Sequence, residues 1–177
     1  DGGPNFDTGR MANVLRLCAD KIGWGEHRTD GHGIGIACHF TFGGYAAHAF
    51  EVSAAGGQLT IHRAVCVVDV GRVINPLGLE AQMMGGTIDG ISTALNLAIT
   101  VANGQVQQQN FSDYQVMRAA QAPREVEVQI VESTAELSGA GEMGVPSVAP
   151  ALANAIHAAT TVRVRKLPIM PELKRML

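Results

Sequence analysis

The feature that most constrains the fold is the strand-like hydrophobic pattern of residues 34–70, which replaces the helical spacing of the preceding segment. Apolar side chains alternate with small or polar ones over residues 34–42, as in a strand with one buried face. Glycine pairs at 43–44 and 56–57 then interrupt the pattern, and each pair can form a tight turn. Residues 45–52 and 59–70 continue as strands. Three strands joined by short glycine turns predict an antiparallel meander.

Segments with helical spacing lie on both sides of this meander. Apolar residues recur every three or four positions over residues 9–23, over 79–98 and after Ser147. The second of these helices has an expected core stripe of Met84, Ile88, Ile91 and Leu95. Residues 126–131 and 162–164 read as further short strands, followed by a loose tail. The pattern predicts an α+β fold, an antiparallel meander sheet with packed helices.

Composition limits the size of the core and the class of partner. With 46% hydrophobic residues among 177, the chain can bury one sizeable core, or two small lobes with a boundary near residue 75. The net charge is -3 and lysine and arginine do not cluster, which argues against nucleic-acid binding. No apolar run is long enough to cross a bilayer, so we expect no direct membrane insertion. The start at Asp1, without Met or a leader pattern, predicts a processed chain or a fragment.

Cysteine and histidine spacing gives no metal site. The three cysteines are scattered, with no Cys-x-x-Cys pair for zinc or an iron–sulfur cluster, and we expect small buried side chains. His39 and His48 lie near a predicted hairpin and could pair across it, as structural histidines. The glycines of 31–35 fail as a dinucleotide loop because they precede a strand rather than a helix. Asp69 is expected to cap the turn into Gly71.

Glu142 is the most unusual chemical group in the sequence. It lies in a glycine-rich loop, residues 138–146, directly before the helix that Ser147 is expected to cap. A partly buried carboxylate in such a loop suits a general base. From the local pattern alone, a solvated loop carboxylate is the commoner case.

Gln82 is a second candidate, because it shares a helical face with Gly85, Gly86 and Asp89. Each interior glycine costs a helix about 1 kcal/mol relative to alanine, so we expect something to pack very close to this face. A side-chain amide can donate and accept in one plane, which fits a polar heterocycle or phosphate oxygens. The alternative is an ordinary surface glutamine.

Two separate runs then resemble the large, molybdopterin-binding subunits of the xanthine dehydrogenase family. The first is Val68-Asp69-Val70-Gly71-Arg72-Val73-Ile74-Asn75-Pro76, followed at the family's spacing by Gln82 and Gly85. The second is Gly139-Ala140-Gly141-Glu142, followed by the run at 149–156 that contains Ala153-Asn154-Ala155. Within the family, residues 23–25 and 110–114 look most like the isoquinoline 1-oxidoreductase beta-subunit branch, which includes aldehyde dehydrogenases.

The resemblance implies that residues 1–177 are the C-terminal portion of a molybdenum-cofactor-binding domain. It assigns Glu142 as the catalytic base beside the molybdenum, and Gln82, Gly85 and Gly141 as contacts of the molybdenum–pterin cofactor, with no protein ligand to the metal. It implies a molybdenum-dependent oxidoreductase that hydroxylates an N-heterocycle or an aldehyde with water as the oxygen source. The rest of the large subunit and an iron–sulfur subunit, which carries the clusters, are the implied partners.

Two points limit what the resemblance implies. The family's large subunit is several-fold longer and carries further cofactor loops, so we expect this chain to be inactive alone. Residues 143–145 differ from the Pro-containing run that often follows the family's glutamate, which leaves the substrate open. The alternative function is a non-catalytic assembly or binding domain derived from the same family. A third reading, a small nucleotide-binding protein, rests only on the glycines of 31–35.

Overall fold

The meander predicted from the sequence is present and forms most of the main sheet. In the computed structural model the strands pair in chain order, with antiparallel registers between neighbours. Phe42 and Gly43 form the first turn, and Gly56 and Gly57 the second, all four with positive φ. The strands are β1 (His32–Thr41), β2 (Gly44–Ala55) and β3 (Gln58–Asp69).

The structure describes residues 5–29 and 31–177. The chain start, residues 1–4, which predicted a processed chain or a fragment, lies outside the described residues, as does Asp30 in the predicted loop before β1.

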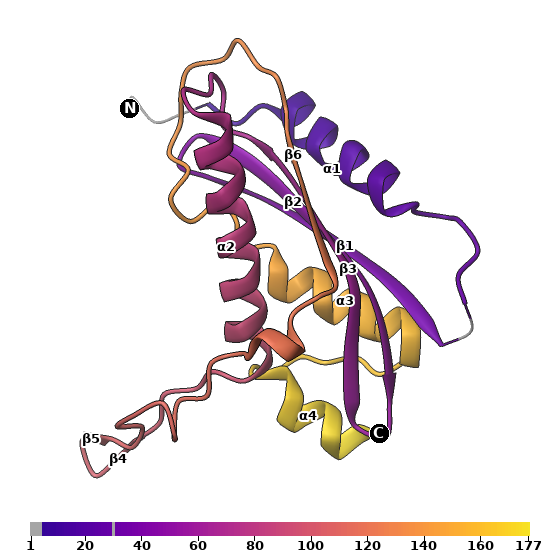
Figure 1. Cartoon of the computed structure of the whole chain (residues 1–177), viewed down its shortest axis with the longest axis vertical. Helices are drawn as coiled ribbons and strands as arrows, with labels where there is room; N and C mark the ends of the chain where they lie inside the picture. Colours follow the sequence, from indigo (N-terminus) through magenta and orange to yellow (C-terminus); the bar gives the residue numbers. More distant parts are fainter. Residues whose placement is uncertain (1–4, 30) are drawn as a thin grey trace.

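A fourth strand makes the sheet mixed rather than purely antiparallel. β6 (Glu125–Ile130) pairs in parallel with β3, which gives the strand order β1-β2-β3-β6. Helix α2 (Pro76–Leu95) forms part of the crossover between the two parallel strands. After α2 the chain forms a small hairpin, β4 (Val101–Ala102) and β5 (Gln105–Val106), which projects from the lower left in Figure 1. A short 3-10 helix, η1 (Ala119–Gln121), then leads into β6.

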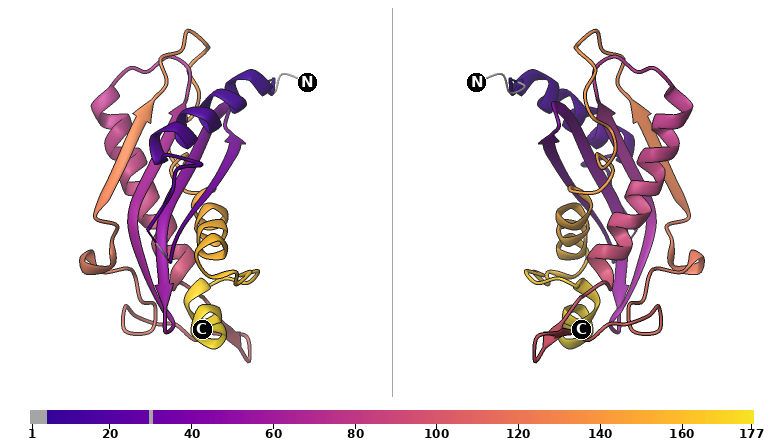
Figure 2. Two further views of the ribbon diagram at one scale, coloured as in Figure 1. Left: turned by 90° about the vertical axis from the view of Figure 1, so that its right-hand side faces the viewer. Right: turned by 90° about the vertical axis from the view of Figure 1, so that its left-hand side faces the viewer.

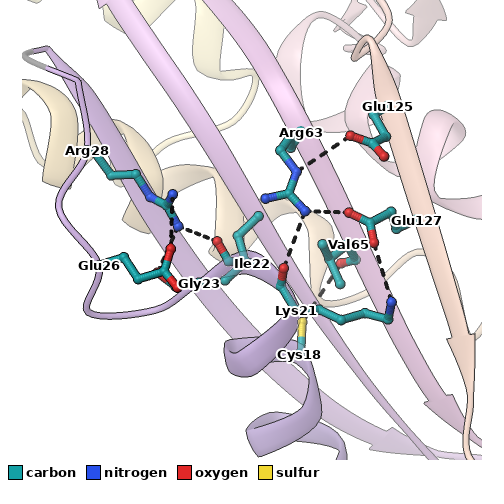
Figure 3. A network of polar contacts seen from close by, with 10 residues as sticks. All are labelled: Cys18, Lys21, Ile22, Gly23, Glu26, Arg28, Arg63, Val65, Glu125 and Glu127. Carbon is teal, nitrogen blue, oxygen red and sulfur yellow. Dashed lines mark hydrogen bonds and ion pairs between the residues drawn. The ribbon is translucent and has the colours of Figure 1, made fainter.

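Ion pairs fix β6 beside β3 and beside the end of helix α1 (Thr8–Ile22) (Figure 3). The Arg63 guanidinium on β3 donates to the Glu127 carboxylate on β6 and lies 3.6 Å from Glu125. Lys21 in the last turn of α1 lies 3.3 Å from the same Glu127 carboxylate, and Arg63 also donates to the Lys21 carbonyl at 3.3 Å. One arginine therefore joins three elements, and the strand pairing it supports spans more than 60 residues of sequence.

Helices cover both faces of the sheet (Figures 1 and 2). α1 packs on one face, where Val14, Cys18 and Ile22 are buried against β2 and β3. The opposite face carries α2 together with α3 (Val148–Thr160) and α4 (Ile169–Met176). The largest core cluster on that face draws side chains from both sides of residue 75.

Helix α3 lies unusually close to β1, because the facing strand positions are glycines. A Cβ atom at Gly35 would come within 2.0 Å of the Ala155 backbone nitrogen, and one at Gly33 within 2.3 Å of the Ala159 nitrogen. The Asn154 amide closes the contact by donating to the Ile36 carbonyl at 3.1 Å. Gly33 and Gly35 are thus explained by backbone-to-backbone packing of a helix on a strand, whereas Gly31 adopts a positive φ of 81°.

Two predictions about the helices are wrong in detail. The expected stripe of α2 is wrong at Met84, which is 41% exposed, whereas Met83 is fully buried. Ile91 and Leu95 are buried and Ile88 packs against the same cluster, as expected. Glycines at 86 and 90 allow the Gly144 backbone and Val148 to approach the helix beside Met83, and an apolar pattern does not identify a glycine as a core position. The short strand expected at 162–164 is absent from the described structure, and the expected loose tail forms α4, which buries Ile169 and Leu173.

The cysteines agree with the sequence analysis: Cys18 and Cys66 are buried and Cys38 is half-buried, all as free thiols. Burial raises the pKa of the Cys66 thiol to about 12. Within the described part of the chain, no helix has both the length and the apolar character that crossing a membrane requires.

Candidate functional site

The structure brings the two candidate motifs into direct contact. The Gln82 side chain in the second turn of α2 donates a hydrogen bond from Nε2 to the backbone carbonyl of Gly141. Gly141 immediately precedes Glu142, so the amide holds the loop at the residue next to the candidate base. These residues are 59 positions apart in sequence, and the contact could not be derived from either motif alone.

A shallow pocket of about 400 Å³ opens beside this hydrogen bond. Its walls are the segment that enters α2, residues 70–79, the Gln82 side chain, and the first part of the glycine loop, residues 137–141. Three large apolar side chains near the pocket are exposed: Ile74 at 77%, Leu77 at 78% and Leu137 at 59%. The pocket wall is therefore largely apolar, with the amide of Gln82 as one of its polar groups.

The start of α2 is fixed by the residues of the first motif. The Asn75 side chain accepts a hydrogen bond from the Gly78 N–H at 3.0 Å, and Pro76 occupies the first helical turn. Both are standard solutions for a helix N-terminus, which has unpaired N–H groups. α2 consequently begins at residue 76 rather than at the expected residue 79, and Gln82 lies in its second turn.

Asp69 anchors the turn that leads into this segment. Its carboxylate accepts from the Gly71 N–H at 3.0 Å, as expected from the sequence, and also from Arg10 on α1 at 2.6 and 2.9 Å. Burial alone would raise the pKa of the Asp69 carboxyl, but the hydrogen bonds from Arg10 and Gly71 outweigh it and the pKa is lowered. The charged carboxylate therefore ties α1 to the edge of the site.

The glycine loop packs directly on α2. A Cβ at Gly86 would lie 3.0 Å from the Cα of Gly144, and a Cβ at Gly90 would lie 2.8 Å from Val148. Met143, directly after Glu142, is fully buried in the same cluster as Met83. The close packing expected on this face of α2 is thus present at Gly86, where the backbone of Gly144 from the same chain contacts the helix.

Gly85 and Gly141 behave differently, because a Cβ at either position would meet nothing within 4 Å. No contact within the described chain requires a glycine at these two positions. Glu142 is also exposed, so the partial burial expected for it is not provided by this chain. The side of the site that carries these three residues is open.

Sequence reasoning missed a polar row behind the loop. Ser147 precedes α3 as expected, but its side chain makes no capping bond. Its hydroxyl instead lies 3.0 Å from His39 Nδ1 and 2.7 Å from His48 Nδ1. The two histidines do not pair across the hairpin as the sequence suggested; both contact one serine about 100 residues away, and no local pattern signals that contact.

Across residues 5–29 and 31–177, no group of three or more His, Cys, Asp or Glu side chains is placed to hold a metal ion. The chemistry that the residues themselves offer is one exposed carboxylate, one fixed amide and an open glycine surface beside an apolar pocket.

Comparison with known proteins gives the same family throughout. The sequence profile described as the molybdopterin cofactor-binding domain matches residues 19–123. The chain is 36% identical to isoquinoline 1-oxidoreductase subunit beta of Brevundimonas diminuta, over 94% of this chain and 22% of that protein. It is 33% identical to the aldehyde oxidoreductase molybdenum-binding subunit of Escherichia coli strain K12, over 71% of this chain and 18% of that subunit.

The fold agrees with solved structures. Quinoline 2-oxidoreductase from Pseudomonas putida 86 superposes with a TM-score of 0.67 at 24% identity, over 75% of this chain and 18% of that one. The chain spans less than a quarter of the length of these relatives. On the profile match over more than half of its residues, the chain belongs to the molybdopterin cofactor-binding domains of the xanthine dehydrogenase family.

Proposed function

We propose that this chain is the C-terminal portion of the cofactor-binding domain of a molybdenum hydroxylase, with Glu142 as the catalytic base. The observation that carries the proposal is the hydrogen bond from Gln82 to the Gly141 carbonyl, which joins the two family motifs at one open pocket. If the two motifs resembled the family only by chance, there would be no reason for them to lie in contact in the folded chain.

The open glycines support a bound group at this surface. Gly85 is inside a helix, where glycine costs about 1 kcal/mol relative to alanine, yet no described neighbour needs the space. Gly141 is likewise unobstructed. Both positions fit a large cofactor that approaches the backbone from outside the chain, and Gln82, Gly85 and Gly141 are the residues that would contact it.

When bound, the molybdenum–pterin cofactor supplies a two-electron oxidation of an electron-poor carbon, with water as the source of the oxygen. Glu142 would serve as the general base for that chemistry, since a carboxylate placed within hydrogen-bond reach of the proton is an effective proton acceptor. The Gln82 amide keeps the backbone beside Glu142 in place, which is the positioning that such catalysis requires.

The substrate class follows from the relatives, whose names specify isoquinoline, quinoline and aldehydes. We therefore propose an N-heterocycle or an aldehyde as substrate. The exposed side chains of Ile74, Leu77 and Leu137 fit an interface with the rest of the large subunit, which would also enclose Glu142. Iron–sulfur clusters on a separate subunit would remove the electrons.

The test is Glu142→Gln in the full-length enzyme, assayed with aldehydes and N-heterocycles. We expect turnover to fall by at least about a hundredfold, because general-base catalysis contributes about 10²–10⁴-fold. The molybdenum content should be unchanged, because the amide preserves the shape of the side chain. Full activity in this variant would refute the role of Glu142, and a full-length protein without molybdenum would favour the alternative of a non-catalytic assembly or binding domain.

A further inference from the structure

Four polar side chains form a continuous row of hydrogen bonds behind the Glu142 loop. The row begins on α2, where the buried Thr87 hydroxyl donates to the Met83 carbonyl at 2.8 Å. Fully buried His48 on β2 is next, with Nε2 3.0 Å from Thr87 Oγ1. Ser147 at the start of α3 follows, 2.7 Å from His48 Nδ1, and half-buried His39 on β1 ends the row, 3.0 Å from Ser147.

The donors and acceptors in this row have one consistent direction. Thr87 has a single hydroxyl proton, which goes to the Met83 carbonyl, so His48 must donate from Nε2 to Thr87. A neutral His48 then accepts at Nδ1 from the Ser147 hydroxyl. Ser147 in turn accepts from His39 Nδ1, which leaves His39 Nε2 as a buried acceptor with no partner among the described residues.

Both imidazoles are neutral at physiological pH. Burial lowers the pKa of His48 to about 3, with a further lowering from His39, and burial lowers the pKa of His39 to about 4. A second proton on His48 would place a donor at Nδ1 opposite the Ser147 hydroxyl and would reverse the order of the row. The order of hydrogen-bond donors and acceptors along the row therefore stays the same over the physiological pH range.

Two members of the row are close in sequence to the candidate site. Thr87 is five residues after Gln82 on the same helix, and Ser147 is five residues after Glu142. Apart from the hydrogen bond from Gln82 to Gly141, the contacts between the loop and α2, from Met143 and the glycines, are apolar or close backbone contacts without directional preference. Directional hydrogen bonds are better suited to fixing one arrangement of the loop.

We propose that the Thr87–His48–Ser147–His39 row is a positioning device that fixes residues 142–147 on α2 and so sets Glu142 relative to Gln82. The inference rests on the proposed function of Glu142. None of the four residues is assigned contact with substrate or cofactor; they act through the loop.

The experiment compares Ser147→Ala with Ser92→Ala in the full-length enzyme. Ser92 is a matched control, since it is also nearly buried and its hydroxyl also accepts a hydrogen bond, from the Met117 N–H at 2.8 Å, outside the row. Hydrogen–deuterium exchange of residues 142–147 is the first readout. We expect about tenfold faster exchange in Ser147→Ala, from the loss of the two hydrogen bonds of its hydroxyl, and no change in Ser92→Ala.

Steady-state kinetics give the second readout. We expect kcat to fall about tenfold in Ser147→Ala with KM within about twofold of wild type, the pattern of a lost transition-state interaction. His48→Asn is the second variant: its Oδ1 can still accept from Ser147, whereas the link to Thr87 is lost. Its exchange rate should lie between those of wild type and Ser147→Ala.

Unchanged exchange in both variants overturns the proposal, as does faster exchange with unaltered kcat. The outcome is separable from the failure of the proposed function. If Glu142→Gln retains full activity while Ser147→Ala still exchanges faster in the loop, the assignment of Glu142 as the base fails. The hydrogen-bonded row then only stabilises the loop and has no role in catalysis.

Discussion

The Gln82 side chain donates its amide hydrogen to the backbone carbonyl of Gly141, so a helix and a loop 59 residues apart meet beside Glu142. Gln82 is exposed, and its contribution to overall stability is therefore small. Its importance is local, because it holds the residue adjacent to the candidate base.

Replacing Gln82 with leucine tests this contact. Leucine has a similar volume but no donor, so the Gly141 carbonyl loses its partner, and we expect kcat to fall by about tenfold or more from the loss of 1–3 kcal/mol of positioning. Steady-state assays of the full-length enzyme, with metal analysis, measure the effect. Asp89→Asn, an exposed change on the same helix, is the control, and equal rates for both variants would contradict the assignment.

Gly35→Ala tests the packing of α3 on β1. A Cβ there would lie 2.0 Å from the Ala155 backbone nitrogen, and backbone cannot move aside as a side chain can. We expect a loss of about 3 kcal/mol or more, at the upper end for overpacking.

Gly85→Ala is the matched comparison, since its Cβ meets nothing within 4 Å. We expect unfolding stability to rise by up to about 1 kcal/mol through helix propensity. Molybdenum content should nevertheless fall, because the methyl group would occupy space proposed for the cofactor. Thermal melting and metal analysis of the full-length protein separate the two effects; a stable, fully loaded Gly85→Ala variant would remove Gly85 from the cofactor surface.

Asp69→Asn should destabilise the protein by about 3 kcal/mol, because it leaves Arg10 without its buried partner. The folded pKa of Asp69 lies below its unfolded value of 3.8, so its contribution is present above that pH and is lost as the pH falls through the folded pKa. The difference between wild type and Asp69→Asn should therefore shrink below about pH 4. Glu172→Gln, which removes an i,i+3 pair on α4 with an exposed arginine, should cost less than about 1 kcal/mol.

His48 should make stability depend on pH in mildly acidic solution. The unfolded chain takes up a proton at His48 near pH 6.5, whereas the folded chain does so only near pH 3. Acid therefore favours the unfolded state, and the unfolding free energy should fall as pH drops through this window. Melting temperatures between pH 7.5 and 4.5 should decline more steeply for wild type than for His48→Asn; parallel curves would show that His48 does not control the decline.

Local sequence patterns were sufficient for the strands of the meander and for helices α1, α2 and α3, but not for α4. Alternation and glycine pairs predicted β1 to β3, and Asn75-Pro76 marked the entry to α2, because these signals depend on neighbouring residues only. The parallel pairing of β6 was not predicted, since Arg63 and Glu127 are 64 residues apart and either charge alone looks like an ordinary surface group.

The candidate site likewise combines features that the sequence predicts with features that depend on the tertiary structure. Glu142 and Gln82 were found through motifs, but the exposure of Glu142 depends on the surface around it and has no sequence signal. Ser147 was expected to cap a helix, because a serine before an apolar run usually does. Two imidazoles from distant strands compete successfully for its hydroxyl, and only the tertiary structure brings them there.

The packing of α3 on the glycines of β1 also has a consequence for the biosynthesis of this protein. Ile36 and Asn154 touch although they are 118 residues apart, so the strand leaves the ribosome long before the helix that covers it. Until then, one side of the newly formed meander is open to water and to other nascent chains. Biosynthesis of the full-length protein should consequently depend on folding assistance until translation has passed the end of α3.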